Sequence, residues 1–234
     1  MSPSTRAALQ GATAALPMLL ALIPFGVIFG ALAAAAGMGL AATLGMTSIV
    51  VAGAAQLAAL QLMTDGAPAL VAVATAAVVN LRMAMYSASV ATHWRGASLK
   101  ARLAAAFVLF DMSYGLAIRR YAERPSLPLD EKLGFYFGAG GVCLVVWIAA
   151  TLAGALLGAR VPPEWGLSVA PALVFLSVAA PFLRARPHLA AAGVAAGVAL
   201  LGAGLPYGLG LTAGAAAGIG AGLLAESAPR RRRA

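Results

Sequence analysis

Charged side chains are scarce in this sequence. They make up 10% of its 234 residues, whereas hydrophobic residues make up 62% and the mean hydropathy is +0.92. Soluble domains usually contain about 25% charged and about 45–50% apolar residues, so too few polar groups remain here to cover a surface that faces water. The same abundance of apolar residues excludes an intrinsically disordered chain. The composition therefore indicates a membrane protein that crosses the bilayer several times.

Cysteine and catalytic motifs are also lacking. Cys143 is the single cysteine, which excludes an intramolecular disulfide and a multi-cysteine metal site. His93 and His188 are the two histidines, and the sequence contains no HExxH, GxSxG or P-loop motif. We therefore expect no enzyme activity, no cofactor and no metal site.

Basic residues are in excess, and the formal net charge is +9. In a soluble protein this excess would suggest a nucleic-acid partner. Here the basic residues lie mainly between apolar runs and in the C-terminal tail, 226–234, where positive charge orients membrane helices. The sequence has no basic face with interleaved aromatic residues, so we expect the lipid bilayer, and no nucleic acid, as a partner.

Clusters of Gly, Pro and charge separate eight apolar segments. The segments cover residues 16–36, 41–63, 68–90, 103–118, 133–159, 167–183, 188–203 and 206–225. The last two are short and only two residues apart, so we expect six to eight transmembrane helices. The predicted fold is an all-α, polytopic helix bundle that forms a single transmembrane domain over residues 1–234. A short polar N-terminus, about 1–12, and the basic tail flank it.

The positions of Lys and Arg predict the orientation of the bundle. With eight spans and a cytoplasmic N-terminus, most basic residues fall on the cytoplasmic side. These are Arg6, Arg119, Arg120, Arg124, Lys132, Arg184, Arg186 and Arg230 to Arg233. A smaller group falls outside, namely Arg95, Lys100, Arg102 and Arg160. We therefore predict that both termini are cytoplasmic.

A few polar side chains lie inside the apolar segments. They are Gln56 in the second segment, Asn80 and Arg82 in the third, and Asp111 in the fourth. A charged group at this depth costs roughly 2.5–3.5 kcal/mol on insertion scales, so each needs a partner or a function. Segments three and four are antiparallel neighbours in the predicted topology, which places Arg82 within reach of Asp111 and predicts an ion pair.

The predicted ion pair has two interpretations. It either fixes the register of two helices, or it forms a site near the midplane where Arg82 binds a carboxylate and Asp111 binds an amine or a proton. Arg82 belongs to a polar stripe at helical spacing. The stripe consists of Thr75, Arg82, Tyr86, Ser89 and His93.

Prolines and glycines mark candidate hinges. Pro17 and Pro24 lie in the first segment, and Gly26 follows closely. Proline inside a helix removes a backbone hydrogen bond, and broken membrane helices expose backbone groups to substrate cavities. We predict that the first helix is broken or kinked, and that Gly53 unwinds the second segment.

Glycines at four-residue spacing recur in several segments. The last segment has the longest register, with Gly210, Gly214, Gly218 and Gly222. Such spacing lets another helix backbone approach closely. The register either packs within the chain or forms a docking face for another subunit.

Five features of the first half resemble the AzlC/YgaZ family in order and spacing. They are Pro24–Gly30 (PFGVIFG), Ala52–Gln56 (AGAAQ), Asn80–Arg82 (NLR), Met85–Ser89 (MYSAS) and Asp111. The resemblance covers residues 10–120 well, and residues 166–175 are similar to the family's second half more loosely. This family supplies the large subunit of two-component branched-chain amino acid exporters.

The resemblance implies a transporter in a bacterial-type inner membrane that exports branched-chain or similar small apolar amino acids. It also implies a small AzlD/YgaH-like membrane subunit as partner and coupling to an ion gradient. It carries over Gln56, Asn80, Arg82 and Asp111 as motif positions. Many relatives follow the aspartate with Glu, whereas this chain has Met112, and this departure bears on proton coupling.

These observations together predict alternating access around a midplane site. Arg82 holds the substrate carboxylate, and Asp111 holds its ammonium group or a coupling proton. Hydrogen bonds to the substrate come from Gln56, Asn80 and Tyr86. A carrier for another small zwitterion and a non-transporting scaffold subunit are the alternatives.

Overall fold

The computed structural model describes residues 1–158, 176, 183, 185–205 and 209–227. The described residues form helices and no strands, which confirms the predicted all-α membrane bundle. In chain order the helices are α1 (Pro3–Ala35), α2 (Leu40–Ile49), α3 (Gly53–Thr64), α4 (Ala69–Val79), α5 (Leu81–Ala91), the 3-10 turn η1 (Thr92–Trp94), α6 (Leu99–Phe107), α7 (Asp111–Glu123), α8 (Leu129–Gly158), α10 (Arg186–Leu201) and α11 (Leu209–Ser227). The predicted sixth segment, 167–183, lies almost wholly outside the described residues.

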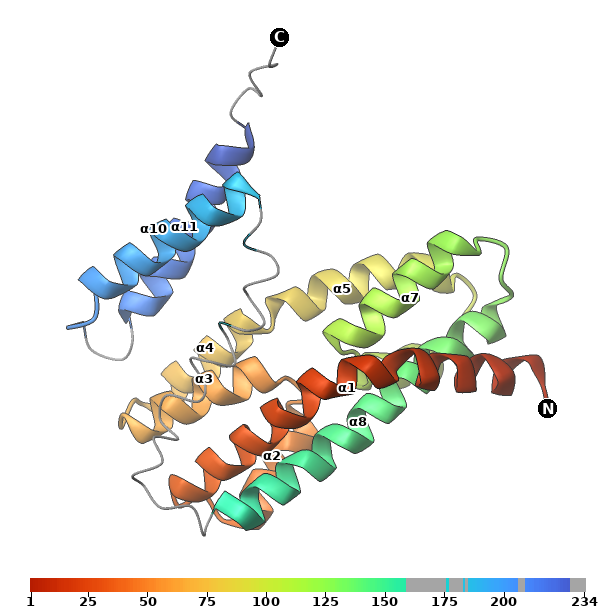
Figure 1. The fold of residues 1–234 in the computed structure, drawn as a ribbon, viewed down its shortest axis with the longest axis horizontal. Helices are drawn as coiled ribbons and strands as arrows, with labels where there is room; N and C mark the ends of the chain where they lie inside the picture. Colours follow the sequence, from red (N-terminus) through yellow and green to blue (C-terminus); the bar gives the residue numbers. More distant parts are fainter. Residues whose placement is uncertain (159–175, 177–182, 184, 206–208, 228–234) are drawn as a thin grey trace.

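Helices α1 and α8 run parallel and side by side over most of their length (Figure 1). Glycines of each helix face the backbone of the other at both ends of the contact. Gly134 faces Ser4 at the start of both helices, and Gly158 faces Ala31 at their ends. A Cβ atom on Gly26, between these two places, would lie 2.8 Å from the Cβ of Ala150. Small residues thus bring the two backbones into direct contact.

The second and fourth apolar segments are each split into two short helices. The second is interrupted at residues 50–52, between α2 and α3, and the fourth at residues 108–110, between α6 and α7. The third segment is interrupted at a single residue, because Asn80 alone separates α4 from α5. The interruption of the second segment lies directly before Gly53, the glycine that the sequence analysis singled out.

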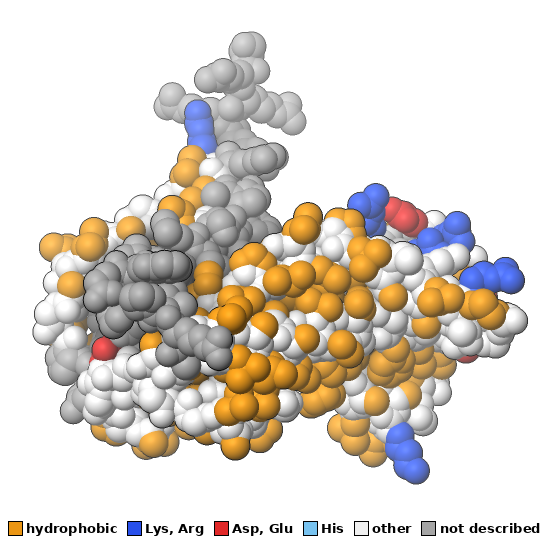
Figure 2. Space-filling view, turned by 60° about the horizontal axis from the view of Figure 1, so that its bottom comes forward, with side chains coloured by type: hydrophobic (Ala, Val, Ile, Leu, Met, Phe, Trp, Pro, Cys, Tyr) orange, Lys and Arg blue, Asp and Glu red, His pale blue; other side chains and the backbone are white. Residues whose placement is uncertain are grey.

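The surface of the bundle is apolar over most of its length. Leu20, Leu70 and Leu201 are 78%, 79% and 91% exposed, and charged side chains gather toward the ends of the molecule (Figure 2). Within the described part of the chain, four helical stretches are long and apolar enough to cross a membrane. These are Pro3–Ala35, Ala69–Trp94, Leu129–Gly158 and Leu209–Ser227. The surface is therefore suited to lipid rather than water.

The first helix was predicted to be either broken or kinked, and the structure shows that it is not broken. It runs without interruption from Pro3 to Ala35 and contains both Pro17 and Pro24. Its contact with α8 extends along almost its whole length, which holds the helix together although two backbone hydrogen bonds are missing. The helix begins within the predicted polar N-terminus, where Ser2 caps it by accepting a hydrogen bond from the Thr5 N–H.

The glycine register of α11 packs within the chain. Gly210 faces Gly202, Gly214 faces Ala195 and Ala199, and Gly218 faces Ala191 and Ala195; Gly222 faces Ala191 as well. All these neighbours belong to α10 or to its end, so α10 occupies the groove that the glycines create. The structure thus shows packing inside a helical hairpin for Gly210, Gly214, Gly218 and Gly222, and their assignment to subunit packing stays a prediction.

The contact between α1 and α8 predicts which glycines tolerate a side chain. A Cβ atom on Gly154 would meet the backbone of Val27, whereas one on Gly141 of the same helix meets nothing within 4 Å. We expect Gly154→Ala to destabilise the protein by about 1–3 kcal/mol, as overpacking does, and Gly141→Ala to be neutral or stabilising by up to about 1 kcal/mol. Thermal unfolding of both variants in detergent measures the difference. Equal melting temperatures would contradict the close α1–α8 contact.

Candidate functional site

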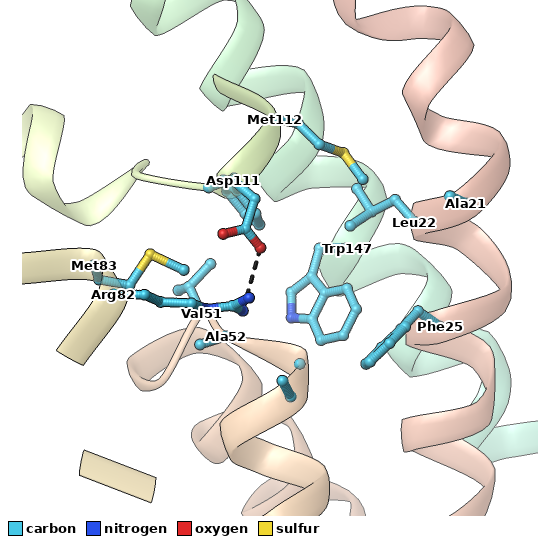
Figure 3. Close-up of a pocket in the computed structure, with 13 residues that line it drawn as sticks. Ala21, Leu22, Phe25, Val51, Ala52, Arg82, Met83, Asp111, Met112 and Trp147 are labelled. Carbon is cyan, nitrogen blue, oxygen red and sulfur yellow. Dashed lines mark ion pairs between the residues drawn. The ribbon is translucent and has the colours of Figure 1, made fainter. Parts of the chain in front are cut away.

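A pocket of about 210 Å³ lies where three helices begin. Its lining includes the first residues of α3, α5 and α7, together with one face of α1 and Trp147 of α8 (Figure 3). Each of these three helices is the second half of an interrupted apolar segment. The first N–H groups of a helix lack partners within it and give this end a partial positive charge, so the pocket receives three such ends.

Arg82 and Asp111 face each other across the pocket. Arg82 Nη2 lies 3.2 Å from Asp111 Oδ2, and the two side chains are 34% and 47% exposed. Asp111 is the first residue of α7, where a negative charge interacts favourably with the helix dipole. Arg82 is the second residue of α5, where the dipole opposes its charge. The ion pair predicted from the sequence is therefore present, and the carboxylate compensates for the unfavourable position of the guanidinium.

The interruption before α7 is stabilised by side chains. Ser113 Oγ accepts a hydrogen bond from the Phe110 N–H at 2.9 Å and is 3.1 Å from the carbonyl oxygens of Val108 and Phe110. Tyr136 of α8 donates its hydroxyl to the Ala105 carbonyl, near the end of α6, at 2.9 Å. Unpaired backbone groups are costly in a membrane. These hydrogen bonds therefore allow the helix to be interrupted at residues 108–110, directly before Asp111.

The interruption before α3 is held by aromatic rings. A Cβ atom on Gly53 would lie 2.7 Å from both the Phe25 and the Trp147 rings, so only glycine lets the start of α3 approach them this closely. The last turn of α2 is tied to α8 by a hydrogen bond of 3.2 Å between the Thr47 and Thr151 hydroxyls, both fully buried. These contacts position Gly53 and Ala54 on the pocket wall.

The rest of the pocket wall is apolar. Leu22 and Phe25 of α1 line one side, and Met83, Phe110 and Met112 surround the ion pair. Met112 directly follows Asp111 in the chain. Its thioether adds apolar surface to the pocket beside Asp111, which leaves Asp111 as the one carboxylate among the lining residues.

The other predicted site residues do not line this pocket. Gln56 is fully buried on α3, and neither its Oε1 nor its Nε2 has a hydrogen-bond partner among the described residues. Asn80 joins α4 to α5, and its buried Oδ1 is likewise without a partner in the described structure. Tyr86 stacks on Tyr114 at a ring distance of 4.3 Å and interacts electrostatically with Asp111. The structure therefore brings Arg82 and Asp111 together, with Tyr86 beside them. The side-chain amides of Gln56 and Asn80 are not part of the pocket wall.

Trp147 was missed by the sequence analysis. It lies on the pocket wall and is only 2% exposed. One signal could have identified it, because it is the side chain with a strong hydrogen-bond donor in the otherwise apolar run 142–150. Cys143, in the same run, is fully buried as a small apolar residue.

A comparison with models of known protein families gives a match. The family model described as AzlC protein matches residues 17–161, which is more than half of the chain and includes every residue that lines the pocket. No curated protein and no solved structure matches the chain. Among the described residues, no group of three or more His, Cys, Asp or Glu side chains is placed to hold a metal ion.

The exposure of the ion pair predicts its effect on stability. Because both side chains are accessible from the pocket, we expect Arg82→Gln or Asp111→Asn to cost no more than about 1 kcal/mol, a fall of about 2–4 °C in melting temperature for a chain of this size. Thermal unfolding of the two variants and of the double variant tests this. A loss of about 3–5 kcal/mol in each single variant, restored in the double variant, would instead assign the pair to helix register.

Proposed function

The chain belongs to the AzlC family, and from this premise we propose that it exports branched-chain or similar small apolar amino acids through the pocket at Arg82 and Asp111. The family is associated with membrane transport of amino acids, and the chain is a multi-pass membrane protein. The substrate, the direction of transport, the site residues and the coupling ion are proposals.

The observation that carries the proposal is a pair of opposite charges in an apolar pocket. Arg82 Nη2 lies 3.2 Å from Asp111 Oδ2. The two charges are therefore close enough to bind the neighbouring carboxylate and ammonium groups of one amino acid. The guanidinium offers several donors to a carboxylate, and the carboxylate of Asp111 accepts from an ammonium group. The surrounding side chains, such as Leu22, Phe25 and Met112, suit an aliphatic side chain rather than a polar one.

The interrupted helices support a transport mechanism. In many transporters, discontinuous helices form the substrate site, and the starts of their second halves face anionic groups. Here the continuous pair α1 and α8 forms one wall of the pocket, and the short helices α3, α5 and α7 form the others. In the proposed cycle the short helices tilt against the α1–α8 pair and open the pocket to each side of the membrane in turn.

Asp111 is the proposed coupling residue. A carboxylate that binds the substrate ammonium in one state can bind a proton in another, which links export to a proton gradient. Met112 supplies no second carboxylate at the adjacent position, so coupling in this chain rests on Asp111. We also propose a bacterial-type inner membrane, cytoplasmic termini and a small AzlD/YgaH-like subunit as partner.

Efflux from preloaded vesicles tests this function. We expect saturable, gradient-dependent efflux of labelled valine, leucine or isoleucine from vesicles that contain the full chain and its proposed small subunit. Arg82→Ala and Asp111→Asn should each lower the rate by at least about 100-fold, because each removes one partner of the zwitterion. The amount of inserted protein is measured alongside.

A second ion pair provides a matched control. Arg119 Nε donates to Glu123 Oε1 at 2.9 Å, outside the pocket and beyond the predicted fourth span. The hydrogen bond from Arg119 holds the pKa of Glu123 below its ordinary value, so this pair is charged near neutral pH. Arg119→Ala and Glu123→Gln should leave efflux within about twofold of wild type. Absence of efflux of all three amino acids from an intact complex would refute the exporter proposal.

A further inference from the structure

The indole of Trp147 has an unused hydrogen-bond donor inside the pocket. The side chain is 2% exposed, and its Nε1 is buried without a hydrogen-bond partner among the described residues. Tryptophan usually finds a partner for this N–H group when it is buried. Figure 3 shows the ring edge that carries the nitrogen turned toward the Arg82 guanidinium. The donor is therefore directed into the site and is left for a bound molecule.

Packing fixes the orientation of this ring. Trp147 stacks on Phe29 at 6.4 Å between ring centroids with an interplanar angle of 18°, and Phe25 contacts it at 6.2 Å. Gly53 lies against the far edge of the indole. With neighbours on its face and on its benzo edge, the ring cannot turn its N–H group elsewhere without moving α1 or α3.

The neighbouring groups in the pocket are also donors. Arg82 Nε is buried without a partner in the described structure, although Nη2 of the same side chain binds Asp111. Gly53 and Ala54, which carry the first N–H groups of α3, line the same pocket, and the N-cap Ala52 has no side chain that could accept from these groups. Donors without acceptors converge beside one acceptor, Asp111. A second anion beside Asp111 would supply the acceptor that these donors need.

We infer that Trp147 Nε1, Arg82 Nε and the start of α3 together bind the carboxylate of the substrate, while Asp111 binds its ammonium group. This inference rests on the proposed transport function and deepens it, since it makes the carboxylate an obligatory feature of the substrate. An amine or an amino alcohol with the same aliphatic group lacks the anion that these donors require. Trp147 is thus a specificity-determining residue for α-amino acids.

The test is ligand binding by the full-length protein in lipid nanodiscs, together with the proposed small subunit where it co-purifies. Titration calorimetry compares leucine with leucinol, in which a neutral hydroxymethyl group replaces the carboxylate, and with 4-methylpentanoate, which lacks the amine. We expect Trp147→Phe to weaken binding of leucine and of 4-methylpentanoate by about 10- to 100-fold, as for loss of one hydrogen bond to a charged group. The weak binding of leucinol should change by less than threefold.

Trp94→Phe is the matched control. Trp94 is 4% exposed, but its Nε1 already donates to the Tyr121 hydroxyl at 3.2 Å, and the residue does not line the pocket. This variant loses a buried indole at a different place, so its affinity for leucine should stay within about threefold of wild type. Any general effect of losing an indole is thereby separated from the effect at the site.

A second measurement keeps Trp147 intact, in case its replacement prevents insertion. The variant Trp94→Phe/Trp165→Phe retains Trp147 as its single tryptophan. Donation of the indole N–H to an anion shifts its fluorescence emission to longer wavelength. We expect this shift with saturating leucine and with 4-methylpentanoate, and not with leucinol.

The outcomes separate this inference from the function on which it rests. If the wild-type protein binds leucine and Trp147→Phe binds it equally well, or if leucine leaves the emission of Trp147 unchanged, the role of Trp147 is wrong while the exporter proposal stands. If the wild-type protein binds none of the carboxylates, both are overturned. Selective loss of carboxylate binding in Trp147→Phe, with Trp94→Phe unaffected, establishes the inference.

Discussion

The direct backbone contact between α1 and α8 is the constraint on which the rest of the structure depends. Lipid exerts little hydrophobic force between helices, so their association relies on close packing. Glycines placed on both helices, from Gly134 opposite Ser4 to Gly158 opposite Ala31, supply it. The contact is long enough to keep α1 helical across two prolines. A rigid two-helix unit results, and shorter elements can be arranged against it.

That unit is what permits interrupted helices at the depth of the membrane. Non-helical backbone is tolerated there only where protein or a cavity surrounds it. One side of α8 meets the interruptions in turn: Tyr136 binds the end of α6, Trp147 contacts the start of α3, and Thr151 binds the last turn of α2. The interruptions then place Arg82 and Asp111 at helix starts that face one pocket. The same helix, α8, therefore packs against the backbone of α1 and also makes the contacts that position the pocket residues.

The sequence predicted the ion pair because charge in an apolar span must find a partner, and few partners were available. It predicted the helical membrane bundle for a similar reason, since the composition leaves no alternative. Apart from the interruption next to Gly53, it did not predict where helices break. Pro17 and Pro24 are strong local signals, yet tertiary contact overrides them, while residues 108–110 contain neither Pro nor Gly and break because Ser113 and α8 satisfy their backbone. The glycine register of α11 was ambiguous, since spacing alone does not say which helix fills a groove.

The proposed site also explains why a charged pair suits a carrier better than a single charge. Before a substrate binds, Arg82 and Asp111 neutralise each other, so neither charge is left unpaired beside the apolar pocket wall. When a zwitterion enters, each charge exchanges its partner for one of opposite sign on the substrate, and the net charge of the pocket does not change. Empty and loaded states then have similar electrostatic energies. A lone arginine would not provide this balance, because its charge would have no partner before the substrate binds.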